Sequence, residues 1–188
     1  MELTLIRHTS VAVAPGICYG QTDVALNDTF ETEAEKVKRD LNGTVFDKVF
    51  TSPLSRCRLL ADYCGFPDAE QDTRLMEMNF GDWEMQRWDE ITDSRLQEWF
   101  DDYVHVCVTG GESYIQHGER IASFMAQLSQ KPYRRVAIFT HGGSMLHILT
   151  ALGLVRVEEA FDHQPPYGGI VRVTIPSASG TAQETKES

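Results

Sequence analysis

The chain has 188 residues, of which 41% are hydrophobic and 24% charged, an ordinary balance for one globular domain. Its formal net charge of −11 argues against nucleic acid or anionic membranes as partners, because both require clustered Lys and Arg. No apolar run approaches the roughly 20 residues that span a bilayer, and no signal-peptide pattern occurs. The four cysteines lie at irregular spacing without a CxxC pair, so we expect reduced thiols and a cytoplasmic location.

The first third of the chain predicts two units in which a strand leads into a helix. An apolar strand over residues 2–7 is followed by a long loop and by a helix that ends near residue 42, with Asp28 as its cap. A short strand over residues 47–51 leads into a helix that Gly65 ends. This second helix is predicted to have Ser52 as its N-cap and Pro53 as its first residue.

Residues 75–112 contain all three tryptophans and show weaker periodicity. We expect them to form an inserted substrate lid of loops and short helices over the sheet edge. The chain then predicts a helix over 113–129, a strand over 134–140, a helix over 143–152 closed by Gly153, and a strand over 171–175. This alternation favours an α/β sandwich with a largely parallel sheet in a single domain, residues 1–176, followed by a disordered tail, residues 177–188.

Two predicted strands deliver histidines into loops. Arg7 and His8 follow the strand over 2–7, and His141 and Gly142 follow the strand over 134–140. Because loops after parallel strands converge at one edge of a sheet, we expect these side chains to share a pocket.

The residue types at this edge suit phosphate chemistry. A neutral imidazole such as that of His8 can attack phosphorus and then pass the phosphoryl group to water. Arg7 and Arg56 would stabilise the non-bridging oxygens, and their charge would disfavour protonation of His8. Arg56 also lies one turn into a helix that follows a strand, where free backbone N–H groups favour anions.

The leaving group needs a proton donor, and the segment around the first tryptophan offers three carboxyl groups. Glu77 is flanked by apolar residues that could keep it protonated, but the residues alone leave Glu77, Asp82 and Glu84 nearly equal as candidates.

Other chemistries lack their motifs. The chain has no GxxxxGK[ST], GxGxxG, GxSxG or HExxH pattern, and no cysteine has an arginine six positions later. His141 and His147 are six residues apart, on different faces of a predicted helix, so we expect no catalytic metal and no cofactor. The remaining histidines are assigned structural or surface roles: His105, His117, His147 and His163.

These motifs resemble the histidine phosphatase superfamily, also called the phosphoglycerate mutase-like family. The resemblance rests on Arg7-His8-Thr9, Ser52-Pro53-Leu54-Ser55-Arg56, the Glu77 segment and His141-Gly142, in the family's order. Residues 77–85 and the turn at 110–113 are most similar to the α-ribazole phosphatases of the cobalamin pathway. The resemblance implies a three-layer α/β/α sandwich with a mainly parallel central sheet.

The resemblance also implies roles for single residues. His8 would be the phosphorylated nucleophile, Glu77 the proton donor, and the phosphate pocket would consist of Arg7, Arg56 and His141. Tyr19 and Gly20 match a loop that closes over substrate, and Thr9 and Gly142 are grouped with them as substrate-binding residues. The chain departs from the family where Thr9 replaces a glycine and Ala14 replaces an asparagine.

The function that these inferences predict is hydrolysis of a small-molecule phosphate ester through a phosphohistidine, with α-ribazole 5'-phosphate as the expected substrate. The aromatic residues Trp83, Trp88, Trp99 and Tyr103 either stack on its planar base or pack the lid against the sheet. A broad-specificity or sugar-phosphate phosphatase is the alternative, and a non-catalytic phospholigand-binding protein is a third. A homodimer is expected by analogy with the family.

Overall fold

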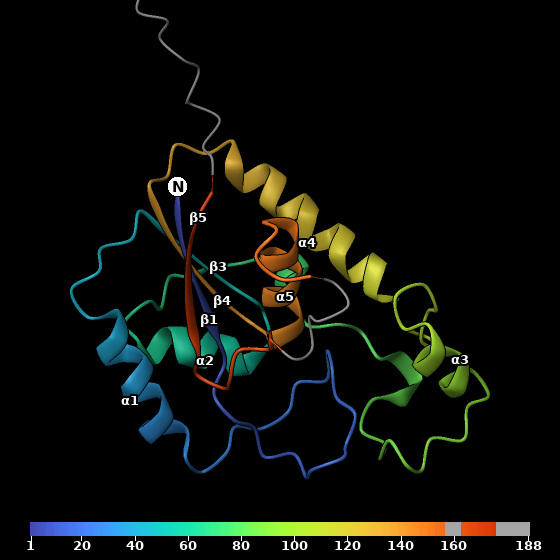
Figure 1. The fold of residues 1–188 in the computed structure, drawn as a ribbon. Helices are drawn as coiled ribbons and strands as arrows, with labels where there is room; N and C mark the ends of the chain where they lie inside the picture. Colours follow the sequence, from blue (N-terminus) through green and yellow to red (C-terminus); the bar gives the residue numbers. More distant parts are fainter. Residues whose placement is uncertain (157–162, 176–188) are drawn as a thin grey trace, which may run out of the picture.

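A computed structural model describes residues 1–156 and 163–175; the predicted tail over 177–188 lies outside these residues. Five strands form one sheet in the order β3-β2-β4-β1-β5 (Figure 1). Their bounds are β1 (Glu2–Arg7), β2 (Lys48–Thr51), β3 (Glu70–Gln71), β4 (Arg135–Thr140) and β5 (Ile170–Thr174). The first four strands are parallel, and only β5 runs antiparallel, against β1. The mainly parallel sheet is therefore confirmed.

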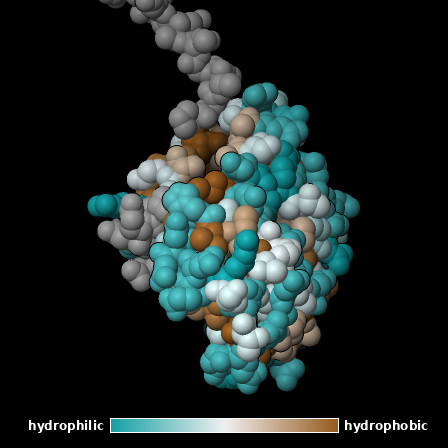
Figure 2. Space-filling model, turned by 90° about the vertical axis from the view of Figure 1, so that its right-hand side faces the viewer, coloured by the Kyte–Doolittle hydropathy of each residue, from teal (hydrophilic) through white to brown (hydrophobic). Residues whose placement is uncertain are grey.

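Helices cover both faces of this sheet, which confirms the three-layer α/β/α sandwich. The helices are α1 (Phe30–Leu41), α2 (Ser55–Tyr63), α3 (Arg95–Asp101), α4 (Tyr114–Ser129) and α5 (Gly142–Ala151). The pleat of β4 sends Val136 and Ile138 into a core with α4 and α5, and sends Ala137 and Phe139 into a core with α1 and α2. The side of the molecule that carries α3 and α4 is largely hydrophilic, with small separate apolar patches (Figure 2).

The central strand pair sets the position of the expected site. β1 and β4 pair in parallel with Leu5 opposite Ile138 and Arg7 opposite Thr140, so both strands end at the same level. The next residues in the chain are His8 and His141. In Figure 1, β1 runs from the labelled N-terminus to the lower edge, where the loops after β1 and the segment with α3 lie.

Residues 75–112 contain one short α-helix and little other regular structure, as the weak periodicity suggested. Besides α3 they hold the 3-10 helix η2 (Gly81–Trp83), and η1 (Thr73–Leu75) leads into them. Their apolar side chains form a third cluster, which includes Trp83, Trp99 and Met78. The two ends of this segment touch: Asp82 N donates to Thr109 O at 2.9 Å, and a Cβ at Gly81 would collide with that carbonyl. Glycine is required there for this close approach.

Two predicted helix caps are wrong. Helix α1 begins at Phe30 after Thr29, and neither Thr29 nor Asp28 caps it; Thr29 donates instead to Glu33, which also accepts from Ser10 N at 2.8 Å. Helix α2 begins at Ser55, later than the predicted start with Ser52 as N-cap and Pro53 as first residue. Its first turn is capped from a distant loop, because Asp23 Oδ1 accepts from Ser55 N at 2.8 Å and Ser55 Oγ at 2.7 Å.

The predicted helix ends at Gly65 and Gly153 are confirmed, because both glycines adopt positive φ angles just after α2 and α5. The start of α4 carries a capping box of Ser113 and Gln116 that was not predicted. Sequence patterns missed β3, which is only two residues long. All four cysteines are free thiols. Across the two described stretches, none of the helices has the length and hydropathy to cross a bilayer.

The core between the sheet and α4 should carry much of the stability. Phe124 is 2% exposed and packs edge-to-face on Phe50, with ring centroids 5.2 Å apart. We expect Phe124→Ala to lower the free energy of unfolding by about 3–5 kcal/mol, because it removes buried area and leaves a cavity. Urea denaturation measures this, with Val45→Ala at an exposed position as the control. A loss under about 1 kcal/mol would show that this core does not stabilise the fold as described.

Candidate active site

His8 and His141 meet where β1 and β4 end. Their ring centroids are 5.1 Å apart at an interplanar angle of 62°, and both side chains are buried. His8 Nδ1 lies 2.7 Å from Thr9 O. A carbonyl oxygen can only accept, so Nδ1 carries the proton and Nε2 keeps its lone pair in the neutral ring. His8 thus has the tautomer that a nucleophilic Nε2 requires.

The surroundings of His8 keep its ring neutral. Burial lowers the pKa of His8 to about 3, and the positive charges of Arg56 and Arg7 act in the same direction, against the opposing hydrogen bond to Thr9. The imidazole is therefore unprotonated at neutral pH.

Arg56 projects from the first turn of α2 and is fully buried. Its Nη1 donates to Thr22 O at 2.9 Å and its Nη2 to Gly20 O at 2.5 Å, while Nε donates to His141 Nδ1 at 3.3 Å. These contacts use three of the five N–H groups of a guanidinium, so two remain for another acceptor.

The contact with Arg56 fixes the tautomer of His141. Since Arg56 Nε can only donate, His141 Nδ1 is the acceptor, and Nε2–H donates to Ser52 Oγ at 2.8 Å. Burial, together with the charge of Arg56, lowers the pKa of His141 well below its ordinary value. Ser52 therefore orients a histidine of the site instead of capping a helix.

Arg7 and Thr9 present buried polar atoms that are not satisfied. Arg7 Nη1 donates to Pro165 O at 2.5 Å, and its guanidinium lies 4.2 Å from the centroid of the Tyr167 ring. Arg7 Nε and Thr9 Oγ1 are buried and find no hydrogen-bond partner among the residues described. Buried donors without partners are costly, so the free Nε of Arg7, in the residue next to His8, fits a site that takes an anion.

The loop over residues 19–23 covers Arg56 and is held by carboxylates. Glu84 accepts from Gln21 N at 2.8 Å, Thr22 N at 2.6 Å and Phe80 N at 3.1 Å. Burial opposes ionisation of Glu84, but these hydrogen bonds and one from the Thr22 hydroxyl outweigh it and lower its pKa. Glu84 thus anchors the loop. Its carboxylate accepts hydrogen bonds from four donors, so it is not placed to deliver a proton to substrate.

Glu77 is the carboxyl group that reaches the site. Its Oε2 accepts from Gly143 N at 3.1 Å and its Oε1 from Met78 N at 3.0 Å. A Cβ at Gly143 would collide with Glu77 Oε1, so glycine lets the start of α5 approach the carboxyl. The backbone of Glu77 is held by Arg120, whose Nη2 donates to Glu77 O at 2.7 Å and pairs with Glu112 at 2.7 Å.

A cavity of about 350 Å³ opens beside these groups. Its lining combines polar residues with aromatic and apolar ones, and Phe80, Trp88 and Trp99 contact one another to form an aromatic wall. The lining residues are Arg7, His8, Glu77, His117, Gly143 and Gln164, together with Ile17, Tyr19, Met78, Phe80, Trp88, Trp99, Tyr114 and Tyr167. Arg56 and His141 lie beneath this surface and do not line it.

The structure separates the predicted aromatic residues into two groups. Trp88 and Trp99 line the cavity and stack on each other with centroids 5.6 Å apart. Trp83 is buried behind them and donates to Asp93, and Tyr103 packs against Trp99 without lining the cavity. Trp83 and Tyr103 therefore pack within the segment over 75–112, whereas Trp88 and Trp99 are accessible from the cavity.

The predicted binding residues also differ in position. Tyr19 lines the cavity, whereas Thr9 and Gly20 act through their carbonyls on His8 and Arg56. Gly143 lines the cavity in place of its neighbour Gly142, which packs closely on Gln164.

The cavity residues that sequence reasoning missed include His117, Gln164 and Tyr167. His117 was assigned a structural role, and it does donate to Ser144 across α4 and α5 at 3.1 Å, yet its ring faces the cavity as well. No sequence pattern marks Gln164 or Tyr167 as site residues. Both lie in the loop before β5, and this loop reaches the cavity only because β5 pairs with β1.

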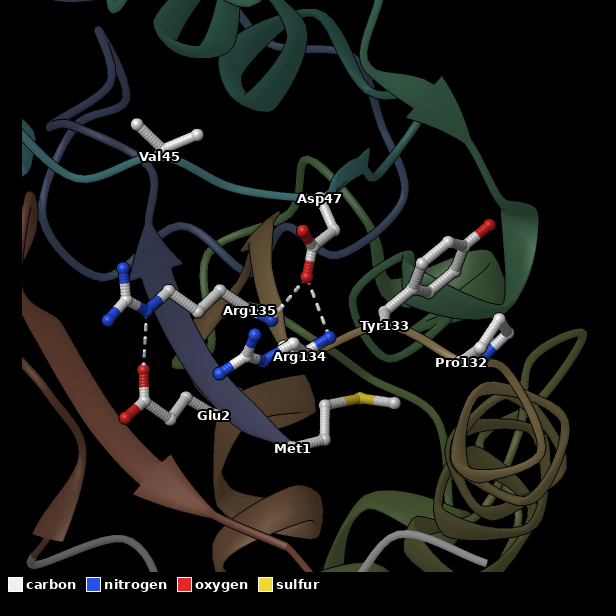
Figure 3. Close-up of a pocket in the computed structure, with 8 residues that line it drawn as sticks. All are labelled: Met1, Glu2, Val45, Asp47, Pro132, Tyr133, Arg134 and Arg135. Carbon is white, nitrogen blue, oxygen red and sulfur yellow. Dashed lines mark hydrogen bonds and ion pairs between the residues drawn. The ribbon is translucent and has the colours of Figure 1, made fainter. Parts of the chain in front are cut away.

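A larger hollow of about 550 Å³ lies at the opposite, amino-terminal edge of the sheet (Figure 3). Three of its charged side chains already have partners: Arg135 Nε pairs with Glu2 at 2.9 Å, and Asp47 accepts from the backbone N–H groups of Arg134 and Arg135. Among the described residues, none of those that line this hollow is a histidine, and the hollow lies at the opposite end of the strands from His8 and His141.

Comparison with known proteins agrees with this geometry. The family model of the histidine phosphatase superfamily, branch 1, matches residues 3–187. The chain belongs to the histidine phosphatase superfamily. The expectation of a phosphoric monoester hydrolase is confirmed at the level of this family.

Relatives within the family include α-ribazole phosphatases. The adenosylcobalamin/alpha-ribazole phosphatase of Escherichia coli K12 is 30% identical over 172 residues, which are 87% of this chain and 84% of the relative. The crystal structure of the alpha-ribazole phosphatase from Shigella flexneri has a TM-score of 0.85 at 26% identity and covers 94% of this chain and 91% of its own. A phosphoglycerate mutase from Thermus thermophilus has a TM-score of 0.76 at 31% identity, with coverages of 94% and 95%.

The buried neutral histidines should make folding sensitive to mild acid. Burial lowers the pKa of His147 to about 4 and that of His8 to about 3, so the unfolded chain binds protons below pH 6.5 that the folded chain does not. Stability is thus present above pH 6.5 and lost as pH falls, by about 2 kcal/mol per such histidine at pH 5.

This dependence is measured by urea denaturation at pH 6.5 and pH 5. We expect His147→Gln to reduce the loss on acidification by about 2 kcal/mol. His163→Gln, at an exposed position, is the control and should behave as the wild type. If His147→Gln lost as much stability on acidification as the wild type, burial of a neutral His147 would not be the cause.

Proposed function

We propose that this protein hydrolyses a phosphate monoester in two steps through a phosphohistidine at His8. The observation that supports this most strongly is the state of His8: a buried, neutral ring whose Nδ1 is held by Thr9 O at 2.7 Å, with Arg7 and Arg56 adjacent. The thiols of Cys18, Cys57 and Cys64 have raised pKa values because of burial, which makes them poor nucleophiles at neutral pH. His8 is therefore the nucleophile that we assign.

In the first step, His8 Nε2 forms a bond to phosphorus as the bond between phosphorus and the ester oxygen breaks. Glu77 donates a proton to the departing oxygen, and the alcohol leaves. In the second step, Glu77 takes a proton from water, the hydroxide oxygen attacks phosphorus, and the bond from phosphorus to Nε2 breaks. Inorganic phosphate leaves, and both His8 and Glu77 return to their starting states. Arg7 and Arg56 stabilise the phosphoryl oxygens during both steps.

The substrate that we propose is α-ribazole 5'-phosphate. The cavity beside His8 has an aromatic wall, including Phe80, Trp88 and Trp99, that suits a planar base. The relatives from Escherichia coli and Shigella flexneri carry the name of this activity. We further propose a cytoplasmic location, consistent with four free cysteines.

The alternatives fit the cavity less well. A mutase or sugar-phosphate phosphatase must recognise a further anionic or hydroxyl-rich group, but Arg7 is the only Lys or Arg among the described residues that line the cavity. A non-catalytic binding protein would not need both a nucleophile and an acid, and His8 and Glu77 both reach the cavity.

Steady-state hydrolysis of several esters tests the proposed substrate. The panel is α-ribazole 5'-phosphate, p-nitrophenyl phosphate, sugar phosphates and phosphoglycerate, with EDTA throughout. We expect kcat/KM for α-ribazole 5'-phosphate to exceed the others by about a hundredfold, roughly 2.7 kcal/mol of transition-state stabilisation. Equal values for all esters would instead identify a broad-specificity phosphatase.

The proposed role of Glu77 predicts a burst of p-nitrophenol release in a variant that lacks its carboxyl group. With p-nitrophenyl phosphate, whose leaving group needs little protonation, Glu77→Gln should still allow His8 to be phosphorylated but slow attack by water. We expect one equivalent of p-nitrophenol to be released quickly, followed by turnover reduced by about 10²–10⁴-fold. Stopped-flow absorbance measures both phases, with Asp82→Asn as the control. Full steady-state activity of Glu77→Gln would exclude it as the acid and base.

The aromatic wall predicts a change in selectivity. Trp88→Leu should raise KM for α-ribazole 5'-phosphate by about tenfold, which is the change in affinity expected when one aromatic contact is lost. The KM for p-nitrophenyl phosphate should change little. Tyr133→Leu is the matched control, because Tyr133 lines the remote hollow of Figure 3 and does not line the cavity. Equal changes for both substrates would mean that Trp88 does not contact the base.

A further inference from the structure

Two tyrosines that are 148 residues apart in the chain meet at the phosphate pocket. Tyr19 lies in the loop that Glu84 anchors, and Tyr167 lies in the loop before β5; their hydroxyl oxygens are 2.6 Å apart. The loop of Tyr167 is fixed to the end of β1, because Gly168 N donates to His8 O at 3.0 Å and Arg7 N donates to Gly169 O at 2.9 Å. The two hydroxyls form a bridge between these loops.

The rings of the bridge lie over the groups that would hold phosphate. The Tyr167 ring centroid is 4.2 Å from Arg7 Cζ and 5.5 Å from the His8 ring centroid. The Tyr19 ring centroid is 5.6 Å from Arg56 Cζ. Both tyrosines line the cavity, and Tyr167 is 41% exposed. Any phosphoryl group that reaches His8 therefore passes close to the bridge.

Counting the protons of the bridge shows an unused donor. Two tyrosine hydroxyls carry two protons, and their mutual hydrogen bond uses one of them. Burial and the contact with Tyr167 raise the pKa of Tyr19, so its hydroxyl stays protonated at neutral pH. The second proton has no partner in this pair and is free to bind an oxygen in the cavity.

The position at which the family pattern has an asparagine does not supply such a contact in this chain. Ala14, where the family pattern has an asparagine, lies in an exposed turn closed by Ile17 N and Ala14 O at 3.2 Å, and it does not line the cavity.

We propose that Tyr167 is an additional phosphate-binding residue: Tyr19 donates to the Tyr167 hydroxyl, and the Tyr167 hydroxyl donates to a phosphoryl oxygen of the substrate. Tyr167 is the donor to phosphate because its ring contacts both Arg7 and His8. Tyr19 acts as a positioning residue that turns the Tyr167 proton toward the pocket. The proposal rests on the phosphate-binding role of His8 and Arg7 in the proposed function, but not on the identity of the leaving group.

The test uses competitive inhibition of p-nitrophenyl phosphate hydrolysis by inorganic phosphate. Tyr167→Phe removes one hydroxyl and keeps the ring over Arg7, so it separates phosphate binding from packing. We expect it to raise both KM and the inhibition constant of phosphate by about tenfold, the effect of losing a hydrogen bond to a charged group. Tyr19→Phe should raise them less, and the double variant should match Tyr167→Phe alone, because the two residues act in series.

Tyr133→Phe is the control, since Tyr133 lines the remote hollow of Figure 3. An unchanged inhibition constant in Tyr167→Phe would overturn the proposal, as would a larger effect of Tyr19→Phe or additive effects in the double variant. An error in the proposed substrate would give a different result. The wild type would then hydrolyse p-nitrophenyl phosphate but act only slowly on α-ribazole 5'-phosphate.

Discussion

The parallel pairing of β1 with β4 is the constraint on which the site depends. Because Arg7 lies opposite Thr140, the residues that follow, His8 and His141, come within 5.1 Å of each other although they are far apart in sequence. The register is fixed by burial, since a shift of one residue would turn Val136 and Ile138 away from the core that they share with α4 and α5. The same packing that stabilises the fold thus sets the distance between the two histidines.

The site concentrates positive charge inside an acidic protein, and carboxylates outside the phosphate pocket make this possible. Glu33 holds the residue after Thr9, Asp23 caps the helix of Arg56, and Glu84 fixes the loop whose carbonyls contact Arg56. Each carboxylate binds backbone N–H groups, so the loops around the pocket keep their shape without placing negative charge beside His8. Burial then keeps His8 neutral, which a nucleophilic imidazole requires.

Sequence patterns predicted the parts of this account that depend on local order. Strand exits, helix ends at Gly65 and Gly153, and the pairing of an arginine with a histidine after β1 are all visible along the chain. The patterns failed where a distant residue decides the outcome: Asp23 displaced the expected cap at Ser52, and Ser52 instead orients His141. Tyr167 could not be found from sequence, because its position depends on the antiparallel return of β5 along β1.

The central claim is that a phosphoryl group is carried by His8. The most direct measurement mixes the Glu77→Gln variant with p-nitrophenyl phosphate, quenches in alkali to preserve phosphohistidine, and locates the modification by tandem mass spectrometry. The account predicts one phosphoryl group per chain, attached to His8 and lost slowly on further incubation. A phosphoryl group on another residue, or product release with no modified chain at any time, would contradict it.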